Sequence, residues 1–530
     1  MKRFVLYLLS CLLLIPAVTI AQDTDNALEL GENWWNERVF YEVFVRSFYD
    51  SDGDGIGDIQ GLISQLDYLN DGDPETDTDL GVTGIWLMPM AQSPSYHGYD
   101  VMDYRTIEAD YGTNEDFLQL IDEAHERGIA VIIDLVLNHT SRDHPWFIDA
   151  TTNPDSEYAD WYILADENPT YSGPTGQTVW HRAGDHYFYG IFCSCMPDLN
   201  YENPDVTAEM YDVTRFWLEE MNVDGFRLDA IRHLIENERI QENTGATHQW
   251  LQDYHDFVHE VNPDAVMVGE IWSSTTQIAP YVPDEVDIAF EFDLANTIIR
   301  SVNFGSLASV TGQQETVLAT YPHGQYATFL TNHDMNRVMD QFRGDIGKAR
   351  IASYVLLTNT GVPFVYYGEE IGMFGVKPDE HIRTPMQWDS TSGTAGFTTS
   401  TPWEPLDAHY VDVNVASQID DSESLLSTYR DLIHVRNNSH ALQYGDFTFV
   451  ENDTRKIYSF VRQSEEESVL VLLDFDDDME DTFTVNLLDG MVINNLTVLY
   501  GEGEVAMGEE GNMLTVSGVA GQAGLIIRIE

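Results

Sequence analysis

Three carboxylic acids in this sequence end short apolar runs, each in a different part of the chain. Asp229 ends the segment Gly-Phe-Arg-Leu-Asp, Glu270 ends Val-Met-Val-Gly-Glu, and Asp334 ends Thr-Asn-His-Asp. Two carboxyl groups about 5 Å apart can hydrolyse a glycosidic bond with retention, because one attacks the anomeric carbon while the other protonates the leaving oxygen. A single acid at such a position often caps the next helix instead. Three acids brought together at one site would repel one another unless function required them.

The neighbours of these acids indicate different tasks for each of them. Arg227 stands two residues before Asp229, on the same face of an extended strand, so we expect it to lower the pKa of Asp229 and keep a nucleophile ionised. The charge of the other acids should raise the pKa of Glu270, which could then act as the general acid. Asp334 could bind sugar hydroxyls and stabilise an oxocarbenium-like transition state.

Eight apolar runs alternate with helical stretches and would position these acids. Runs without strict polar alternation are typical of strands buried on both faces, and their alternation with helices indicates parallel strands. Thr113 can cap one such helix, and Pro204 can open another. The pattern predicts an α/β fold, a (β/α)8 TIM barrel with its active site at the C-terminal ends of the strands. The eight runs are Val39–Val45, Val82–Leu87, Ile129–Leu137, Gly225–Asp229, Ala265–Glu270, Val286–Phe292, Tyr326–Asp334 and Val362–Glu370.

Two interruptions of this strand–helix alternation define the expected domains. Residues 140–203 are rich in Asp, Asn, Gly, Pro and aromatic residues and give no strand–helix unit, so we expect an inserted subdomain after the third strand. From about residue 441 the pattern changes to alternating runs, which predicts a C-terminal antiparallel β-sandwich over residues 441–530. The barrel is then formed by residues 33–139 and 204–440.

The N-terminus is typical of a secretory signal. Met1-Lys2-Arg3 is followed by an apolar run from Phe4 to Ile20 and then by a polar segment, so residues 1–21 are predicted to be a signal peptide. An uncleaved anchor helix is the alternative. The signal implies a secreted protein, extracellular or periplasmic, with no membrane attachment after its removal.

The charge of the chain excludes several classes of partner. Its 530 residues include 25 Lys and Arg against 90 Asp and Glu, a formal net charge of −65. Nucleic acid and anionic membranes would be repelled by this surface, whereas a neutral sugar would not. Because the acidic excess runs through the whole chain, adaptation to high salt is one interpretation and an acidic secreted protein is the other. We expect a monomer.

Two cysteines, Cys193 and Cys195, remain after the predicted signal. Their Cys-Ser-Cys spacing looks too tight for the Cα separation that disulfides prefer, and no four-ligand zinc pattern accompanies them. We therefore expect two free thiols in a loop.

Four ordered motifs resemble those of the α-amylase family of retaining glycoside hydrolases. They are the segments 134–139, 225–233, 269–272 and 329–334, and the similarity covers nearly all of the mature sequence. The resemblance implies that Asp229 is the nucleophile, Glu270 the general acid/base and Asp334 the transition-state stabiliser. It also implies a set of substrate-binding residues, in which Tyr99 stacks beneath the sugar: His97, Tyr99, Asp100, His139, Arg227, Arg232, His333, Arg337 and Arg383.

Two further segments place the chain in a subgroup. Residues 196–200 and 384–388 resemble members that lie between the oligo-1,6-glucosidases and the neopullulanases. The first strand follows the predicted signal directly, without the extra domain of the neopullulanases. The Arg232-His233 pair resembles the Lys-His pair of amylases, with an altered hydrogen-bond geometry at the adjoining subsite.

The sequence also predicts bound calcium. Acidic residues alternate with glycines between Asp50 and Asp58, which gives oxygen ligands in a turn as a hard cation requires, although the loop is not a true EF-hand. The resemblance implies ligation of a first calcium by four Asp side chains and the Ile56 carbonyl, and of a second between barrel and insertion. The predicted ligands are Asp50, Asp52, Asp54, Ile56 and Asp58 for the first, and Asn138, Asp198 and the His233 carbonyl for the second.

These features together indicate a secreted, calcium-dependent α-glucan hydrolase. We expect an endo-acting α-amylase that cleaves α-1,4 bonds in starch and maltooligosaccharides. An exo-acting α-glucosidase, an oligo-1,6-glucosidase or a transglycosylase acting on short oligosaccharides is the nearest alternative. A non-catalytic glycan-binding or transporter-accessory protein is a remote one, because all three carboxylates are retained.

Overall fold

All eight predicted barrel strands are present in the computed structural model of the chain. They form one parallel sheet in the order β11-β10-β9-β5-β2-β1-β13-β12. A parallel bridge between Phe290 and Ala327 links the two outer strands, so the sheet closes on itself. The (β/α)8 fold is therefore confirmed. The strands are β1 (Phe40–Val43), β2 (Gly84–Leu87), β5 (Ala130–Leu135), β9 (Gly225–Leu228), β10 (Val266–Gly269), β11 (Ile288–Ala289), β12 (Ala327–Phe329) and β13 (Val362–Tyr366).

The structure describes residues 28, 30–31, 33–478, 480–488, 490–491, 493–508 and 512–530. The predicted signal peptide, residues 1–21, lies outside the described residues. Within the described ranges, no helix is both long enough and apolar enough to cross a membrane.

The barrel strands form because both of their faces are buried. Every residue of β1, β5, β9 and β10 is buried, so hydrophobic side chains can point both into the barrel and toward the outer helices. Gly225 opens β9 at φ +153°, and a Cβ on it would lie 2.1 Å from the carbonyl oxygen of Val266 on β10. The strand that carries Arg227 therefore requires glycine at this point.

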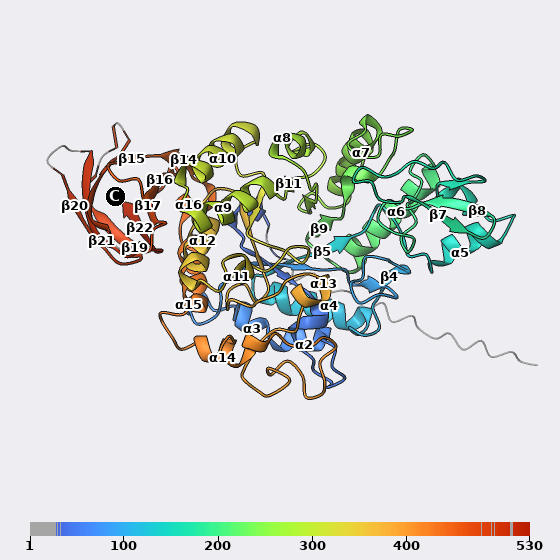
Figure 1. Ribbon diagram of the computed structural model, residues 1–530, viewed down its shortest axis with the longest axis horizontal. Coiled ribbons are helices and arrows are strands. Elements are labelled where there is room, and N and C mark those ends of the chain that lie inside the picture. Colours follow the sequence, from blue (N-terminus) through green and yellow to red (C-terminus); the bar gives the residue numbers. More distant parts are fainter. Residues whose placement is uncertain are drawn as a thin grey trace, which may run out of the picture.

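Helices surround the barrel (Figure 1). Thr113 and Asp116 form the capping box of α4, as the sequence predicted for Thr113, and Pro204 occupies the first turn of α6. A π-helical turn, Phe216–Glu220, continues α6. The longer helices are α2 (Ile59–Ser64), α4 (Asn114–Glu126), α6 (Pro204–Arg215), α7 (Gly245–Val261), α9 (Phe292–Phe304), α10 (Leu307–Thr320), α12 (Ile346–Thr358) and α15 (Leu425–Asn437). Short helices are α1 (Val45–Phe48), α3 (Leu66–Leu69), α8 (Thr275–Ile278), α11 (Val338–Gln341), α13 (Asp379–Ile382), α14 (Val415–Gln418) and α16 (His440–Tyr444).

The segment between β5 and α6 projects from the barrel as a small separate layer (Figure 1). It contains α5 (Pro145–Thr152) and an antiparallel sheet in the order β6-β8-β7. Val179, Trp180, Tyr189 and Ile191 form a small core of its own. The sheet strands are β6 (Leu164–Ala165), β7 (Trp180–Ala183) and β8 (His186–Tyr189).

The C-terminal region is a β-sandwich, as predicted. Its two antiparallel sheets have the orders β14-β16-β17-β22-β19 and β15-β18-β21-β20, and side chains of both sheets share one core. The sequence did not predict β14, β15 or β20. The strands are β14 (Asp446–Phe449), β15 (Glu451–Asn452), β16 (Ile457–Gln463), β17 (Ser468–Asp474), β18 (Glu480–Asn486), β19 (Leu496–Tyr500), β20 (Glu504–Met507), β21 (Met513–Val519) and β22 (Gly524–Ile529).

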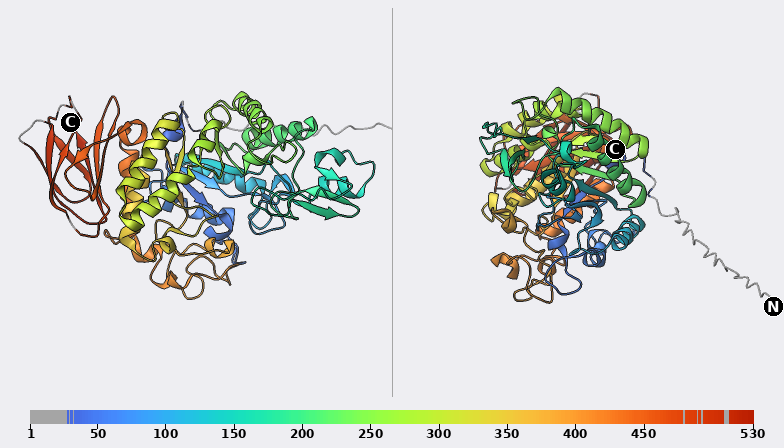
Figure 2. Two further views of the ribbon diagram at one scale, coloured as in Figure 1. Left: turned by 45° about the horizontal axis from the view of Figure 1, so that its top comes forward. Right: turned by 90° about the vertical axis from the view of Figure 1, so that its right-hand side faces the viewer.

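The sandwich packs against barrel helices at the end of the molecule opposite the inserted layer (Figure 1, Figure 2). Arg462 of β16 is buried and donates hydrogen bonds to the carbonyl oxygens of Thr358 and Asn359 at the end of α12. Tyr354 of α12 lies beside Tyr500 of β19, with ring centroids 5.7 Å apart. A cation at the C-terminal end of a helix satisfies carbonyls that have no partner within the helix, so Arg462 joins the two domains.

Candidate functional site

A pocket of about 490 Å³ opens at the C-terminal ends of the barrel strands. This is where a (β/α)8 barrel gathers the residues that follow its strands. The pocket brings together side chains from the barrel rim and from the inserted layer. Predicted site residues that line it are His97, Tyr99, His139, Asp229, Arg232, His233, Glu270, Asp334 and Arg383.

A buried arginine connects the acids at the floor of this pocket. Arg227 is 1% exposed, and its Nη1 lies 2.8 Å from Asp229 Oδ1 and 2.8 Å from Asp134 Oδ1. Its Nη2 lies 3.3 Å from Glu270 Oε2. The same Glu270 oxygen accepts a hydrogen bond of 2.8 Å from the backbone N–H of Ala230. One guanidinium therefore holds the carboxyl groups of Asp229 and Glu270 beside each other and offsets their charge.

Burial raises the pKa of Asp229 to about 6. Arg227 acts in the opposite direction, as predicted from the sequence, but burial together with the charges of Asp134 and Asp334 outweighs it. The expected net lowering of this pKa is therefore wrong. Burial is a property of the folded pocket and was not visible in the spacing of Arg227 and Asp229.

The other two acids of the pocket have pKa values shifted in opposite directions. Burial and the charges of Asp229 and Asp334 raise the pKa of Glu270, in the direction predicted. Burial also disfavours ionised Asp334, but His333, Arg383 and Arg227 outweigh it and lower the pKa of Asp334 to about 2. Environments that shift the pKa values of neighbouring carboxyl groups in opposite directions are typical of sites that need one protonated acid and one ionised carboxylate.

A chain of hydrogen bonds fixes His333, whose Nε2 lies 3.6 Å from Asp334 Oδ2. Its Nδ1 lies 2.5 Å from Glu42 Oε1, and its Nε2 lies 2.7 Å from the hydroxyl of Tyr99. That hydroxyl donates to Asp134 Oδ2 at 2.8 Å, so it can accept the Nε2–H of His333. Burial disfavours the charged ring, but Asp334 and Glu42 outweigh it and raise the pKa of His333. A doubly protonated His333 fits both contacts and places positive charge beside Asp334.

Arg383 holds Asp334 from the other side. Its Nη2 lies 2.8 Å from Asp334 Oδ1, and its Nε donates to the carbonyl oxygen of His333 at 2.9 Å. His139 also lines the pocket, and burial lowers its pKa to about 3, so its ring is neutral. Hydrogen bonds and ion pairs thus hold the charged side chains at the floor of the pocket in fixed orientations.

The match to known proteins identifies the family. Residues 42–445 match the family described as "Alpha amylase, catalytic domain". This chain belongs to the α-amylase family of glycoside hydrolases. The resemblance found in its four motifs is confirmed, and the chain is an enzyme of that family.

Family members that are named for different activities are similar to this chain. Alpha-amylase 3 of Dictyoglomus thermophilum is 37% identical over 460 residues, which cover 86% of this chain and 88% of that protein. Oligo-1,6-glucosidase of Parageobacillus thermoglucosidasius is 32% identical over 556 residues, covering 90% and 96%. The crystal structure of α-amylase from H. orenii shares 40% identity with a TM-score of 0.84, covering 93% of this chain and 99% of that one.

Four residues predicted to bind substrate do not line the pocket of this α-amylase-family enzyme: Asp100, Arg227, His333 and Arg337. Arg337 is fully buried, and its guanidinium lies over the rings of Tyr366 and Tyr367. It donates to the carbonyl oxygens of Ile382 and Tyr367 at 2.9 and 2.6 Å, so it supports the end of α13, directly before Arg383. Asp100 is also buried.

Asp100 accepts hydrogen bonds within its own loop. Ser93 Oγ donates to Asp100 Oδ1 at 2.8 Å, and Ser95 Oγ donates to the same oxygen. His97, which lines the pocket, lies 3.9 Å from Asp100. Asp100 therefore orders the loop that presents His97 and Tyr99.

Exposed aromatic side chains at the pocket wall were missed by sequence reasoning. Phe192 is 45% exposed and Trp272 is 42% exposed, and both line the pocket. Trp272 lies within a recognised motif, so its position was available as a signal, whereas Phe192 lies in the insertion. Met196 and Asp379 also line the pocket and were not predicted to do so.

The expectation of two free thiols is wrong, because Cys193 and Cys195 form a disulfide. A turn brings their Cα atoms to 5.2 Å, inside the range that disulfides accept. Both residues line the pocket next to Phe192. The bridge therefore restrains the part of the insertion that faces the pocket.

The acidic loop predicted to bind calcium gathers three of its four aspartates. Oxygens of Asp50, Asp52 and Asp58 lie within 4.8 Å of one another, and Asp54 is not part of this group. Backbone N–H groups also bond to these side chains, including that of Gly55 to Asp50 at 2.8 Å. The clustered oxygen donors fit a hard cation.

The second predicted calcium site contains buried oxygens without partners. Asn138 Oδ1, Asp198 Oδ2 and Glu236 Oε1 have no hydrogen-bond partner within the described part of the chain. Burial and then the charge of Glu236 raise the pKa of Asp198, and burial raises the pKa of Glu236 to about 7. His233, whose carbonyl was predicted as a ligand, lies in the pocket wall. Unpaired buried oxygens of this kind fit a cation, and Glu236 is a donor that sequence reasoning missed.

Titration of the pocket acids predicts a bell-shaped pH dependence of kcat/KM. If Asp229 is the nucleophile, it must be ionised to attack, so activity should fall as the pH drops through about 6, the raised pKa of that acid. If Glu270 is the general acid, it must hold a proton, so activity should also fall at higher pH, and its raised pKa moves that limb to higher pH. Initial rates on a maltooligosaccharide across the pH range, at constant ionic strength, measure both limbs. Full activity well below pH 6 would contradict the raised pKa of Asp229.

Proposed function

We propose that the chain is a secreted endo-acting α-amylase that hydrolyses α-1,4-glucosidic bonds in starch and maltooligosaccharides with retention. The observation that carries this proposal is the sharing of one buried guanidinium by Asp229 and Glu270 in the barrel pocket. Carboxyl groups held together in this way favour the short separation of retaining enzymes. The α-amylases among its relatives support the substrate class.

In the first step Asp229 attacks the anomeric carbon while Glu270 donates its proton to the leaving glycosidic oxygen. The carbon–oxygen bond of the substrate breaks, and an ester between sugar and Asp229 forms. In the second step Glu270 removes a proton from water, whose oxygen displaces Asp229 and restores both acids. Two inversions at the same carbon give net retention.

The surrounding residues support this chemistry by charge and contact. Asp334, kept ionised by His333 and Arg383, can bind sugar hydroxyls and stabilise positive charge on the ring during both steps. Tyr99 presents an aromatic face under the sugar, and Trp272 and Phe192 offer further faces along the wall. Arg232, whose Nη1 donates to the carbonyl oxygen of Trp272 at 2.6 Å, braces that wall.

An exo-acting enzyme of the same family is the second candidate, since an oligo-1,6-glucosidase is also among the relatives. A time course of products from amylose and from maltose, with calcium at high salt, distinguishes the two. An endo-amylase should release mixed oligosaccharides early from amylose and attack maltose little. Glucose as the sole early product from both substrates would replace this proposal with an α-glucosidase.

We also propose that calcium binds at the two oxygen-rich sites. Asp50, Asp52 and Asp58 would hold one ion, and Asn138, Asp198 and Glu236 would contribute to the other. Bound calcium would neutralise clustered carboxylates and fix the insertion against the barrel, without taking part in bond cleavage.

Removing calcium should therefore lower the unfolding temperature. A ligand at 100 times its Kd stabilises the folded state by about 2.7 kcal/mol per site. Calorimetry in excess chelator and in excess calcium measures the difference, and Glu236→Gln should reduce it because the second site loses a charged donor. Identical unfolding curves in chelator and in calcium would contradict the proposal.

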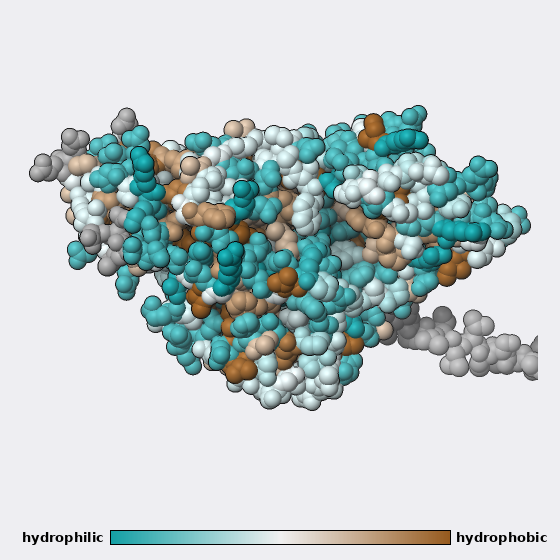
Figure 3. All heavy atoms as spheres, viewed as in Figure 1, coloured by the Kyte–Doolittle hydropathy of each residue, from teal (hydrophilic) through white to brown (hydrophobic). Residues whose placement is uncertain are grey.

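The acidic surface supports adaptation to high salt, which we propose together with secretion. The net charge is −65, and Figure 3 shows hydrophilic residues over most of the visible face, with apolar residues in separate patches. Salt should screen repulsion between these carboxylates. Activity should consequently hold or rise from low to molar salt, and a monotonic loss would contradict the adaptation.

A further inference from the structure

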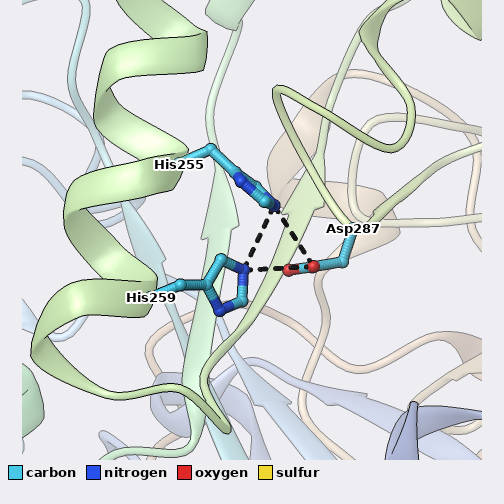
Figure 4. Close-up of side chains that lie close together, drawn as sticks. All are labelled: His255, His259 and Asp287. Carbon is cyan, nitrogen blue, oxygen red and sulfur yellow. Dashed lines mark hydrogen bonds and ion pairs between the residues drawn. The ribbon is translucent and has the colours of Figure 1, made fainter. Parts of the chain in front are cut away.

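Two histidines of α7 and one aspartate from the segment before β11 form a cluster away from the substrate pocket. His255 and His259 are four residues apart on this helix and therefore share one of its faces, and Asp287 immediately precedes β11. Figure 4 shows both imidazole rings directed toward the Asp287 carboxylate. Ligand atoms of the three residues lie within 4.8 Å of one another, and none of the three lines the pocket.

Three ligand atoms of this cluster form a nearly equal-sided triangle. Asp287 Oδ1 lies 3.3 Å from His255 Nε2 and 3.2 Å from His259 Nε2, and the two Nε2 atoms lie 3.1 Å apart. Each Nε2 carries at most one hydrogen and an ionised carboxylate carries none. Hydrogen bonds can therefore satisfy at most two of the three contacts, whereas an ion bound by all three atoms satisfies every one.

Contacts behind the triangle orient its atoms as in metal sites. His259 Nδ1 lies 3.3 Å from the carbonyl oxygen of Pro263, so a neutral ring that donates there presents the lone pair of Nε2 to the cluster. Asp287 Oδ2 accepts a hydrogen bond of 2.7 Å from the backbone N–H of Met267 on β10. A backbone carbonyl behind a histidine and a donor behind a carboxylate are typical supports of metal ligands.

We propose that His255, His259 and Asp287 bind a divalent transition-metal ion, with zinc the favoured one. Two imidazole nitrogens with one carboxylate suit zinc better than calcium, which prefers oxygen ligands. Zinc–nitrogen bonds of 2.0–2.1 Å in a tetrahedral site place ligand atoms about 3.3 Å apart. The three separations in the cluster are close to that spacing.

The ion would join the helix that follows β9 to the strands β10 and β11. The side chains of His255, His259 and Asp287 are 17%, 23% and 9% exposed, so an ion can reach them and water can complete its coordination. β9, which carries Arg227 and precedes Asp229, pairs with β10, so the site would brace this part of the barrel from outside. The proposed role is structural and independent of the reaction proposed above.

The test is zinc binding to the untagged full-length protein, stripped of metals and then saturated with calcium. Calorimetric titration with zinc chloride should show one equivalent that is absent from the variant H255Q/H259Q. Asp287→Asn should weaken that binding at least about tenfold, as expected when a charged ligand is lost. Zinc should raise the unfolding temperature of the wild type and not that of H255Q/H259Q. Cobalt(II) bound at the same stoichiometry should give the visible absorption bands of a four-coordinate site.

His248→Gln is the matched control, because His248 lies on the same helix and pairs with Glu285 at 2.9 Å instead of with the cluster. This variant should bind zinc as the wild type does. Circular dichroism and unchanged hydrolytic activity establish that each variant is folded, and His255→Gln alone serves if the double variant does not fold. Absence of zinc binding by the wild type, or equal binding by H255Q/H259Q, would overturn the proposal.

Discussion

Replacing Asp229 with asparagine should lower kcat on maltooligosaccharides by at least about 10⁴-fold, the order of loss seen when a covalent nucleophile is removed. The amide keeps the shape of the side chain but cannot form the ester with the anomeric carbon. It also loses the ion pair with Arg227, whose Nη1 lies 2.8 Å from the carboxylate. Initial rates from reducing-sugar release measure kcat and KM separately.

Asp379→Asn is the matched control for this substitution. Asp379 lines the same pocket and lies 3.7 Å from Arg383, which also pairs with Asp334. Its loss should change KM by a small factor and leave kcat within about an order of magnitude. Substantial turnover by D229N would assign the nucleophile to another group of the pocket.

The barrel was predictable because its strands are buried on both faces. Such strands give apolar runs that stand out even when the hydrogen-bonded part is short, as in β11 and β12. Strands β14 and β20 were missed for the converse reason. At least half of the residues in each are well exposed, so neither an apolar run nor a clear alternation marks them in the sequence.

The meeting of Asp229, Glu270 and Asp334 in one pocket was predictable because barrel topology brings strand ends to one rim. Contacts that depend on loops were not predictable in this way. Arg337 turns into the core between Tyr366 and Tyr367, and Phe192 reaches the pocket through a turn that also closes the disulfide. Spacing along the chain does not determine the direction of a side chain in a loop.

Burial is a second property that sequence alone did not provide. The effect of Arg227 on Asp229 was predicted with the correct sign, but the desolvation that exceeds it depends on how completely the pocket encloses the acid. The partner of His255 and His259 shows a related limit. Their four-residue spacing is evident in the sequence, whereas Asp287 joins them only because β11 follows β10 in the closed sheet.

Replacing Glu270 with glutamine should lower kcat on maltooligosaccharides by about 10²–10⁴-fold, the usual contribution of a general acid and base. Glutamine can still accept the hydrogen bond from Ala230, which is 2.8 Å long in the wild type, so the pocket should keep its shape and its affinity for substrate. The high-pH limb of the kcat/KM profile should also disappear, because it reports the proton of Glu270.

An aryl maltoside with a good leaving group separates this role from a structural one. Such a leaving group needs no proton, so E270Q should still form the ester on Asp229 and give a burst of phenol followed by slow turnover. Azide, which attacks without a general base, should restore turnover and yield the α-glycosyl azide. D229N should show neither the burst nor the rescue, since it cannot form the ester. Glu209→Gln, which removes a surface partner of Arg105, should behave as the wild type. Wild-type kcat in E270Q, or turnover indifferent to azide, would remove Glu270 from the acid/base role.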